Sequence, residues 1–181
     1  MLEVREMTID DYHLFASIES SLETNERFVV SYKDEGFEYD YQVVDNIRKV
    51  YKACEMPVKD YFSSENHHIL FAYIEDEFVG QITVWKHWNK TCYIDDIRVK
   101  ADHKGMGVGQ ALLEVSMDWA MDNGLKAMML ETQDVNAPAC KFYLKNGFEI
   151  GGIDKYMYKY LGGPETHETA ILFYKSLEEV E

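Results

Sequence analysis

The fold is decided by Tyr93-Ile94-Asp95-Asp96-Ile97-Arg98-Val99 and, after four intervening residues, by Lys104-Gly105-Met106-Gly107-Val108-Gly109-Gln110. The first stretch predicts a β-strand, and the second predicts a turn that opens a helix. Closely spaced glycines at a helix start let backbone N–H groups converge on a phosphate, and the helix dipole favours negative charge there. We therefore expect a strand, a phosphate-binding turn and a helix in succession.

The strand over residues 93–99 breaks the alternation of a regular strand. Ile94 is apolar at an even position, whereas Ile97 is apolar at an odd one. A β-bulge near Asp95-Asp96 would reconcile the two halves. It would also leave backbone N–H and C=O groups ready to hold an extended ligand that carries amides. A shift of the core register with no ligand is the alternative. The residues of this strand that we expect at the ligand are Ile97, Arg98 and Val99.

The glycine run over residues 104–110 does not match two common phosphate-binding motifs. No Gly-Lys-Ser/Thr ends it, as a Walker A loop requires, and its Gly-x-Gly-x-Gly spacing differs from the dinucleotide fingerprint Gly-x-Gly-x-x-Gly. A glycine-rich turn with no ligand is a further alternative. That alternative leaves a cost of up to about 1 kcal/mol for each helix-start glycine without compensation.

Periodicity outward from this centre predicts one α/β (α+β) domain over residues 1–181, because no linker or repeat divides the chain. Strands are expected at 2–7, 69–74, 78–85, 93–99, 127–132, 148–153 and 170–177. Helices are expected at 12–18 after a capping box of Thr8 and Asp11, at 39–51, at 108–119, and from an Asn136 cap to Asn146. The order β-α-α-β-β-β-α-β-α-β-β predicts a mixed, mostly antiparallel sheet flanked by helices.

The amino-acid composition limits the classes of partner that the protein is expected to bind. The formal net charge is −15, from 33 acidic and 18 basic residues, which opposes nucleic-acid binding and would attract a cationic substrate, although excess acid can also serve solubility alone. No apolar run of about 18 residues and no signal-peptide pattern is present, so we expect a cytoplasmic protein without a membrane span. The cysteines Cys54, Cys92 and Cys140 have no metal-binding spacing, and no metal is predicted.

Two motifs resemble the GNAT superfamily of acetyltransferases. Its pyrophosphate loop, Arg/Gln-x-x-Gly-x-Gly/Ala, is matched by Lys104, Gly107 and Gly109, with lysine as a departure that keeps the charge but lacks the arginine fork. Residues 136–148 are similar to the family's Asn-x-x-Ala-x-x-Phe-Tyr-x-x-x-Gly-Phe segment. The resemblance covers residues 67–148 and implies a GNAT-like sheet with acetyl-CoA as cosubstrate. The residues it implies at acetyl-CoA are Lys104, Gly105, Met106, Gly107, Val108, Gly109, Gln110, Asn136 and Tyr143, besides the strand residues above.

Within the superfamily, the stretches 93–99, 130–134 and 139–143 resemble streptothricin acetyltransferases. This resemblance implies acetylation of an amine on the β-lysine part of that antibiotic, and hence resistance. Related alternatives are acetylation of a protein N-terminus or lysine, a polyamine or an aminoglycoside. A non-catalytic acetyl-CoA sensor is an alternative of another class. A homodimer is expected by analogy, and residues 25–64 would shape the acceptor site, with Tyr39, Asp40, Tyr41 and Asp45 suited to a cation.

An acetyltransferase must take a proton from its amine acceptor, whose pKa is near 10.4 in the free state. Asp95 or Asp96, together with Glu131, could orient the cation and accept that proton, although each acid could instead be paired or solvated. A backbone N–H of the bulged strand could stabilise the oxyanion. Family resemblance makes Tyr143 the candidate acid for the departing thiolate, and a packed helix tyrosine is the alternative. Cys140 has no histidine motif near it, so direct transfer is expected.

Overall fold

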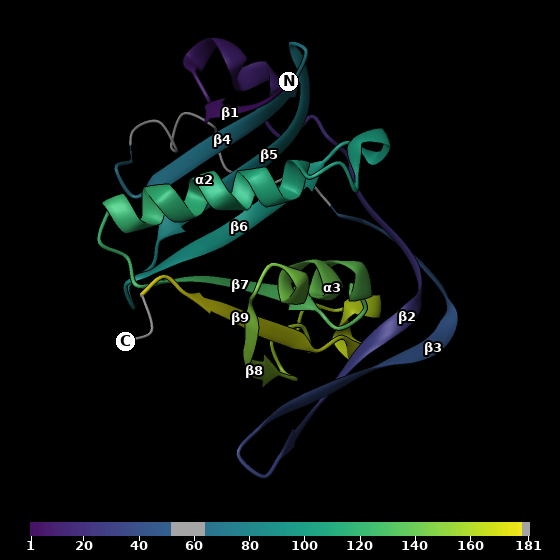
Figure 1. The fold of residues 1–181 in the computed structure, drawn as a ribbon. Coiled ribbons are helices and arrows are strands. Elements are labelled where there is room, and N and C mark those ends of the chain that lie inside the picture. The colour runs from purple at the N-terminus through teal and green to yellow at the C-terminus, as the bar shows by residue number, and fades with distance from the viewer. Residues whose placement is uncertain (52–63, 179–181) are drawn as a thin grey trace. The chain divides into compact units, whose positions relative to one another are not determined.

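The computed structural model describes residues 1–51 and 64–178, so Cys54 and part of the expected acceptor segment lie outside the described residues. The described chain forms two compact units (Figure 1). The first contains residues 1–20, 51, 64–128 and 176–178, and the second contains residues 21–50 and 129–175. No helix among the described residues is long and apolar enough to cross a membrane. The cytoplasmic location and the single domain stay predictions.

Four antiparallel strands form the sheet of the first unit in the order β1-β4-β5-β6. They are β1 (Leu2–Glu6), β4 (His67–Ile74), β5 (Glu77–Lys86) and β6 (Thr91–Val99). Glu75 and Asp76 adopt left-handed backbone angles between β4 and β5, which suits the twist of a two-residue hairpin. The predicted strands are therefore confirmed in this unit.

Helix α2 (Val108–Asp122) covers one face of this sheet, as Figure 1 shows. It comes very close to β5 at Gly80, where an added Cβ would lie 2.9 Å from Val108 Cγ1 and 3.2 Å from Leu112 Cδ1. A glycine is therefore required for the helix to sit at this depth. The helix ends at Asp122, directly before Asn123-Gly124 and three residues beyond the expected range of 108–119.

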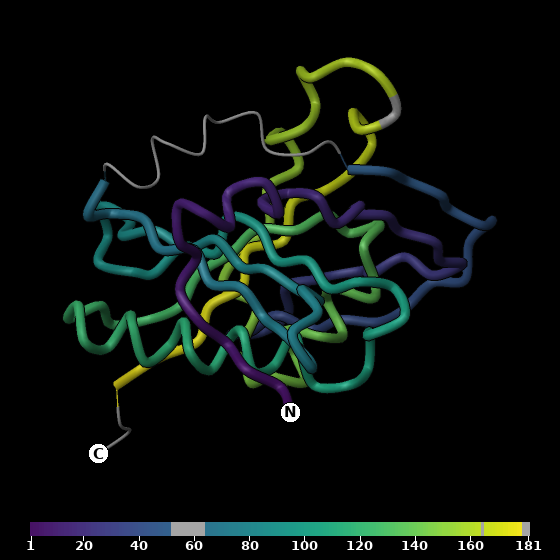
Figure 2. The backbone as a smooth tube through the Cα atoms, turned by 90° about the horizontal axis from the view of Figure 1, so that it is seen from above, coloured from purple at the N-terminus to yellow at the C-terminus, as the bar shows by residue number. Residues whose placement is uncertain are grey.

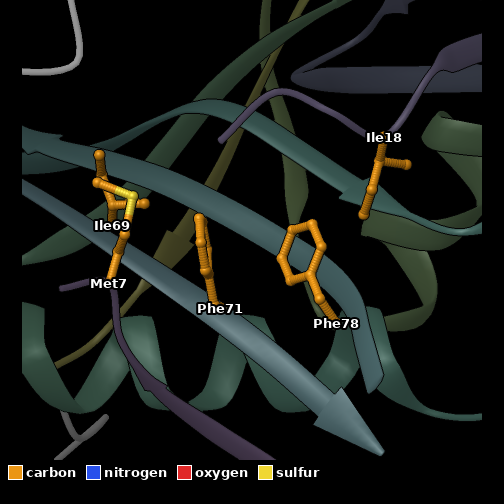
Figure 3. Packing of buried hydrophobic residues seen from close by; sticks show 5 residues of the cluster. All are labelled: Met7, Ile18, Ile69, Phe71 and Phe78. Atoms are coloured by element: carbon orange, nitrogen blue, oxygen red, sulfur yellow. The ribbon is translucent and has the colours of Figure 1, made fainter. Parts of the chain in front are cut away.

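The opposite face of the sheet is covered by the segment after β1. Figure 3 shows the cluster of Met7, Ile18, Ile69, Phe71 and Phe78, and the two phenylalanine rings have centroids 4.6 Å apart. A short 3-10 helix, η1 (Ile9–Leu14), lies within this segment. This packing removes apolar surface from water on both faces of the strands.

The second unit contains all but the two end residues of the hairpin of β2 (Ser20–Lys33) and β3 (Gly36–Tyr51), which doubles back at two turn residues (Figure 2). It also contains most of β7 (Ala127–Gln133) and the whole of α3 (Ala137–Lys145) and β8 (Glu149–Asp154). Strand β9 (Ala170–Ser176) lies between β7 and β8 and pairs antiparallel with β8. The expected class, a mixed and mostly antiparallel sheet with helices, is confirmed.

Two predicted helices near the N-terminus are wrong. Residues 12–18 do not form an α-helix, although the Thr8 and Asp11 capping box is present, with Thr8 N donating to Asp11 Oδ2 at 3.1 Å. The box opens η1, which ends at Leu14. Residues 39–51 belong to strand β3 and not to a helix.

The composition of residues 39–51 explains why they form a strand. Seven of these residues are valine, isoleucine or tyrosine, types that favour extended backbone and pack well on a pleated surface. Strand β2 supplies the partner, and the Phe28 ring lies 5.2 Å from Tyr39 and 5.4 Å from Tyr41, measured between centroids. The apolar spacing also matched a helix, but the cross-strand contacts decide the outcome.

Candidate functional site

Strand β6 carries the predicted bulge. Thr83 of β5 pairs with Asp96 and Val84 pairs with Ile94, so Asp95 is the extra residue on β6. The bulge keeps Ile94 buried while Asp96 shares the opposite face with Thr83. The register prediction is therefore confirmed, and the local break in pairing lies at an acidic side chain.

The Asp96 carboxylate is held by hydrogen bonds within the first unit. Arg98 Nε lies 2.8 Å from Oδ1 and 2.9 Å from Oδ2, and Gln81 Nε2 donates to Oδ2 at 2.9 Å. Arg98 is buried and also donates to the backbone oxygen of Ile18 at 3.0 Å. Gln81 Oε1 accepts the Ala16 N–H at 2.8 Å, so the network fixes the segment that covers this face. Asp96 and the Arg98 side chain thus serve the structure.

Asp95 has a different environment. The residue is exposed, yet nearby protein atoms desolvate its carboxyl group and raise the pKa above its usual value. The charge of Asp96 raises this pKa further, and His67 lowers it. A proton therefore binds Asp95 more readily than it binds a fully solvated aspartate.

The glycine run forms an exposed turn at the N-terminus of α2. Gly105 has a φ of 82° and Gly107, the residue before the helix, has a φ of 86°. Residues that carry a side chain rarely adopt these backbone angles, so the turn requires glycine at both positions. No acidic side chain lies in the first turn of α2, which leaves the partial positive charge of the helix end for an anion. Lys104 is exposed directly before the turn.

Glu131 lies on β7 in the second unit. Burial raises the pKa of its carboxyl group to about 7, Lys49 lowers it and Glu168 raises it. Among the described residues, its Oε1 atom is buried without a hydrogen-bond partner. A carboxyl group that titrates near neutral pH can accept a proton and release it under ordinary conditions.

Helix α3 begins as the sequence predicted and holds Tyr143 in an aromatic environment. Asn136 caps the helix by accepting the Ala139 N–H at 3.2 Å. Tyr143 is 6% exposed, and its ring centroid lies 5.4 Å from that of Phe148 and 5.9 Å from that of Phe173. The ring is therefore fixed by packing. Roles of Asn136 and Tyr143 at acetyl-CoA stay predictions.

The Cys140 thiol lies in surroundings that oppose a role as a nucleophile. Burial raises the pKa of the Cys140 thiol to about 12, which opposes a thiolate nucleophile.

The two tyrosines proposed to bind a cation already have aromatic and cationic partners. The Tyr41 ring has the Lys141 ammonium 4.5 Å from its centroid, and Tyr39 stacks on Phe28. These contacts give Tyr39 and Tyr41 structural roles in the hairpin.

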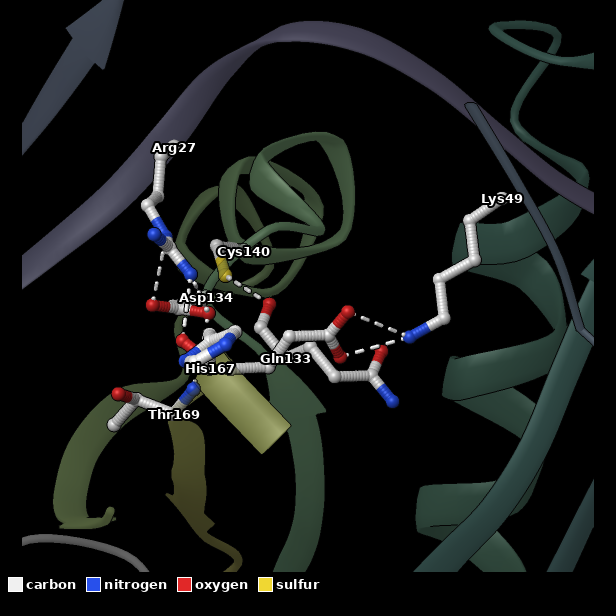
Figure 4. A network of polar contacts seen from close by, with 8 residues as sticks. Arg27, Lys49, Gln133, Asp134, Cys140, His167 and Thr169 are labelled. Carbon is white, nitrogen blue, oxygen red and sulfur yellow. Dashed lines mark hydrogen bonds and ion pairs between the residues drawn. The ribbon is translucent and has the colours of Figure 1, made fainter. Parts of the chain in front are cut away.

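Sequence reasoning missed a polar network in the second unit (Figure 4). Arg27 Nε donates to Asp134 Oδ2 at 3.0 Å, and Asp134 Oδ1 accepts the Thr169 N–H at 3.0 Å. Lys49 Nζ lies 2.9 Å and 2.8 Å from the two carboxylate oxygens of Glu168. The partners are 35 to 119 residues apart in the sequence, and Lys49 was placed on a helix, so no local pattern connected them.

A bulged strand, an exposed glycine turn and the helix that follows it form an arrangement that can bind the phosphate groups of a ligand. The chain belongs to the acetyltransferase (GNAT) family, whose model matches residues 19–148. The predicted family and the predicted N-acetyltransferase class are confirmed.

Individual relatives are similar over most of the chain. Streptothricin acetyltransferase A of Bacillus subtilis (strain 168) is 36% identical over 149 residues, which are 82% of this chain and 81% of the relative. Streptothricin acetyltransferase of Escherichia coli is 38% identical over 150 residues, 82% of each chain. A crystal structure from Bacillus anthracis str. Ames, assigned as a streptothricin acetyltransferase in complex with acetyl coenzyme A, has a TM-score of 0.90. It is 34% identical and covers 97% of this chain and 99% of its own.

Proposed function

We propose that the whole chain works as one domain that transfers the acetyl group of acetyl-CoA to an amine of streptothricin or a similar cationic small molecule. Relatives named for streptothricin acetylation support this acceptor. The net charge of −15 supports a cationic acceptor over an anionic one. A resistance role follows, because acetylation removes a positive charge from the antibiotic.

The observation that carries the transferase proposal is the glycine turn before α2. Its left-handed residues, Gly105 and Gly107, let successive N–H groups face one anion, as the pyrophosphate of acetyl-CoA requires. Lys104 adds a positive charge beside the turn, and the bulge on β6 supplies backbone groups for the amides of the pantetheine arm. The residues present therefore fit acetyl-CoA, which when bound supplies the acetyl thioester.

Glu131 is the proposed base. An alkylamine with a pKa near 10.4 is neutral in about one molecule in 10³ at pH 7, so a group that takes its proton raises the reactive fraction. Glu131, with a pKa of about 7 and a buried oxygen without a partner in the described chain, suits this task. Asp96 is engaged by Arg98 and Gln81, and Asp95 remains a second candidate that could orient the cation.

Tyr143 is the proposed acid. As the amine nitrogen bonds to the carbonyl carbon, the carbon–sulfur bond breaks, and Tyr143 donates its hydroxyl proton to the sulfur while Glu131 holds the proton taken from nitrogen. A backbone N–H beside the bulge donates to the carbonyl oxygen as negative charge develops there. The fixed aromatic packing of Tyr143 limits the positions of its hydroxyl group.

Acetyl-CoA consumption can test the acceptor, with free thiol as the readout. Streptothricin, a polyamine, an aminoglycoside and a peptide with a free N-terminus would be compared at equal concentration. We expect the highest kcat/KM for streptothricin. Efficient turnover of the peptide with none of streptothricin would overturn the acceptor and leave the acetyltransferase class. Acetyl-CoA binding with no turnover of any acceptor would favour the sensor alternative.

We also propose that two copies of the chain associate through the β2–β3 hairpin. Its exposed apolar side chains include Tyr32 at 63%, Val43 at 77% and Val50 at 65% exposure. A two-stranded hairpin is marginal by itself, and exposed apolar side chains along it favour an interface. Light scattering on a sizing column would test this, and a monomer at all concentrations would contradict it. Val43→Glu should shift a dimer towards monomer.

A further inference from the structure

The second unit contains a cavity of about 260 Å³. None of its ten lining residues is one that we assigned to acetyl-CoA or to proton transfer. Half of them are apolar, and the polar half consists of Arg27, Asp134, Lys155, His167 and Thr169. Pockets for drug-sized ligands measure about 300 to 1,000 Å³, so this cavity suits a smaller molecule.

Backbone hydrogen bonds fix one wall of the cavity. The Phe28 N–H donates to Asp134 O at 2.8 Å, and the Asp134 N–H donates to Thr169 O at 2.9 Å. The Thr169 N–H donates in turn to Asp134 Oδ1 at 3.0 Å. Strand β2, the residue after β7 and the residue before β9 are therefore held together, and the wall keeps its shape without a ligand.

Asp134 supplies the carboxylate among the described lining residues, and that carboxylate is already engaged (Figure 4). Arg27 Nε donates to Oδ2 at 3.0 Å, and the Thr169 N–H takes Oδ1. The Asp134 side chain is only 12% exposed. Because its oxygens have charged and backbone donors, Asp134 has little to offer a cation from solution.

Several hydrogen-bond donors of the lining are still open. Within the described chain, the Lys155 ammonium, the His167 ring and the Thr169 hydroxyl have no hydrogen-bond or ion-pair partner. Arg27 uses Nε and Nη2 for Asp134 and for His167 O, which leaves Nη1. Two cationic side chains face one carboxylate in this lining, so a ligand that brings acceptor atoms and negative charge is the best match.

The apolar half of the lining distinguishes an organic anion from an inorganic one. Val29 is 41% exposed, and Val30 and Ile153 are half-buried, so the lining has apolar surface that a ligand can cover. Inorganic phosphate would bring acceptor atoms but would leave this surface uncovered. A short organic acid matches both halves, because its carboxylate accepts hydrogen bonds while its hydrocarbon part covers apolar groups.

We propose that this cavity binds a small organic acid, with the carboxylate at Lys155, Arg27 and Thr169 and the hydrocarbon part against the apolar lining. This ligand differs in class from both acetyl-CoA and the cationic acceptor, so the cavity is a second binding site of the enzyme. The protein has a net charge of −15, and the cationic donors of the lining supply the local attraction that an anion needs.

Butyrate is the probe that tests the site, by NMR titration of the isotope-labelled whole protein at constant ionic strength. We expect saturable shifts at the N–H groups of Phe28, Asp134 and Thr169, with a dissociation constant on the order of 1 mM. Acetate lacks most of the hydrocarbon and butyramide lacks the charge, so both should bind several-fold more weakly. Equal binding of butyrate and butyramide, or no saturable shift, would overturn the inference. Phosphate binding as tight as that of butyrate would show a general anion site and would also overturn it.

Lys155→Met should weaken butyrate binding about tenfold, since it removes an exposed ammonium and leaves the fold intact. Thr169→Val keeps the N–H bond to Asp134 and should weaken binding several-fold. Lys159→Met is the matched control, because Lys159 is outside the lining and its ammonium lies 4.9 Å from the Tyr156 ring centroid. Equal losses in both lysine variants would indicate an effect of general surface charge and contradict the site. The titration needs no turnover, so its outcome is independent of the proposed acetyl transfer.

Discussion

Arg98 and Asp96 lie two positions apart on β6, and the guanidinium Nε of Arg98 contacts both carboxylate oxygens of Asp96 at 2.8 Å and 2.9 Å. Removing this carboxylate charge leaves a buried guanidinium with a weaker partner. We expect Asp96→Asn to lower the free energy of unfolding by about 2 kcal/mol, within the range for hydrogen bonds to charged groups. Denaturant unfolding measures this change.

Asp95→Asn is the matched control for Asp96→Asn, because Asp95 is the adjacent acid but is exposed. It should change stability much less. If Asp96→Asn unfolds like the parent protein but loses turnover, Asp96 belongs to the chemistry and its structural assignment is wrong.

Gly107→Val should abolish detectable acetyl-CoA binding in a folded protein. Valine disfavours the φ of 86° at this position, so the turn must rearrange and its N–H groups no longer converge. Calorimetry with acetyl-CoA measures the affinity, and thermal melting confirms that the protein is folded. Unchanged affinity would rule out the glycine turn as the pyrophosphate site.

Gly124→Val provides the same kind of backbone strain at the other end of α2. Gly124 has a φ of 70°, and an added Cβ at either Gly107 or Gly124 would have no atom within 4 Å. Both variants should therefore lose a similar amount of stability, whereas Gly124→Val should keep its acetyl-CoA affinity. A matching loss of affinity in both variants would indicate a general effect of strain.

The sequence near the glycine turn predicted its structure well because the signals there are local. Glycine spacing marks the turn, the apolar period marks α2, and the out-of-phase isoleucines mark the bulge at Asp95. Residues 39–51 were mispredicted because their apolar spacing fits a helix, while the contacts that select a strand come from β2. The two-residue turn after Lys33 was the available hairpin signal.

The candidate site was predictable in part. The acidic residues of the site could be identified from the sequences of the predicted strands. Their burial and their hydrogen-bond partners could not be predicted in this way. Asp96 is paired by Gln81, which is 15 residues away, and Glu131 is influenced by residues from two other segments of the chain. The charge on a carboxyl group depends on burial and neighbours, which the sequence fixes only through the complete fold.

The rate constant kcat/KM for streptothricin should fall several-fold as salt rises from about 0.01 M to 0.15 M. The Debye length shortens from about 30 Å to 8 Å over this range, which weakens the attraction between a polycation and a protein of net charge −15. The value of kcat should change less, because bound substrate is already near its partners. An uncharged amine acceptor should show a flat kcat/KM, and the same flat response for streptothricin would contradict electrostatic attraction.

Glu131→Gln should stabilise the protein at neutral and alkaline pH. The Glu131 pKa rises from an ordinary 4.5 to about 7 on folding, so the folded state binds this proton more tightly than the unfolded state. The parent therefore loses stability as pH rises from 4.5 to 7, and the glutamine variant lacks this loss. We expect a gain on the order of 3 kcal/mol above pH 7, and almost none below pH 4.5, from unfolding curves. An equal gain at both pH values would exclude a raised pKa as the cause.

Tyr143→Phe should lower kcat while preserving the fold and acetyl-CoA affinity. The change removes one oxygen and keeps the ring that packs against Phe148 and Phe173, so the buried contacts survive. General acid catalysis contributes about 10² to 10⁴-fold, and kcat should fall on that scale. Phe142→Leu, beside it on α3, is the control for ring packing and should act mainly on stability. The pH profile is decisive, because the parent should lose kcat at high pH as the phenol ionises, whereas the phenylalanine variant should lack this decline. A variant with the parental kcat and the same alkaline decline would show that another group protonates the sulfur.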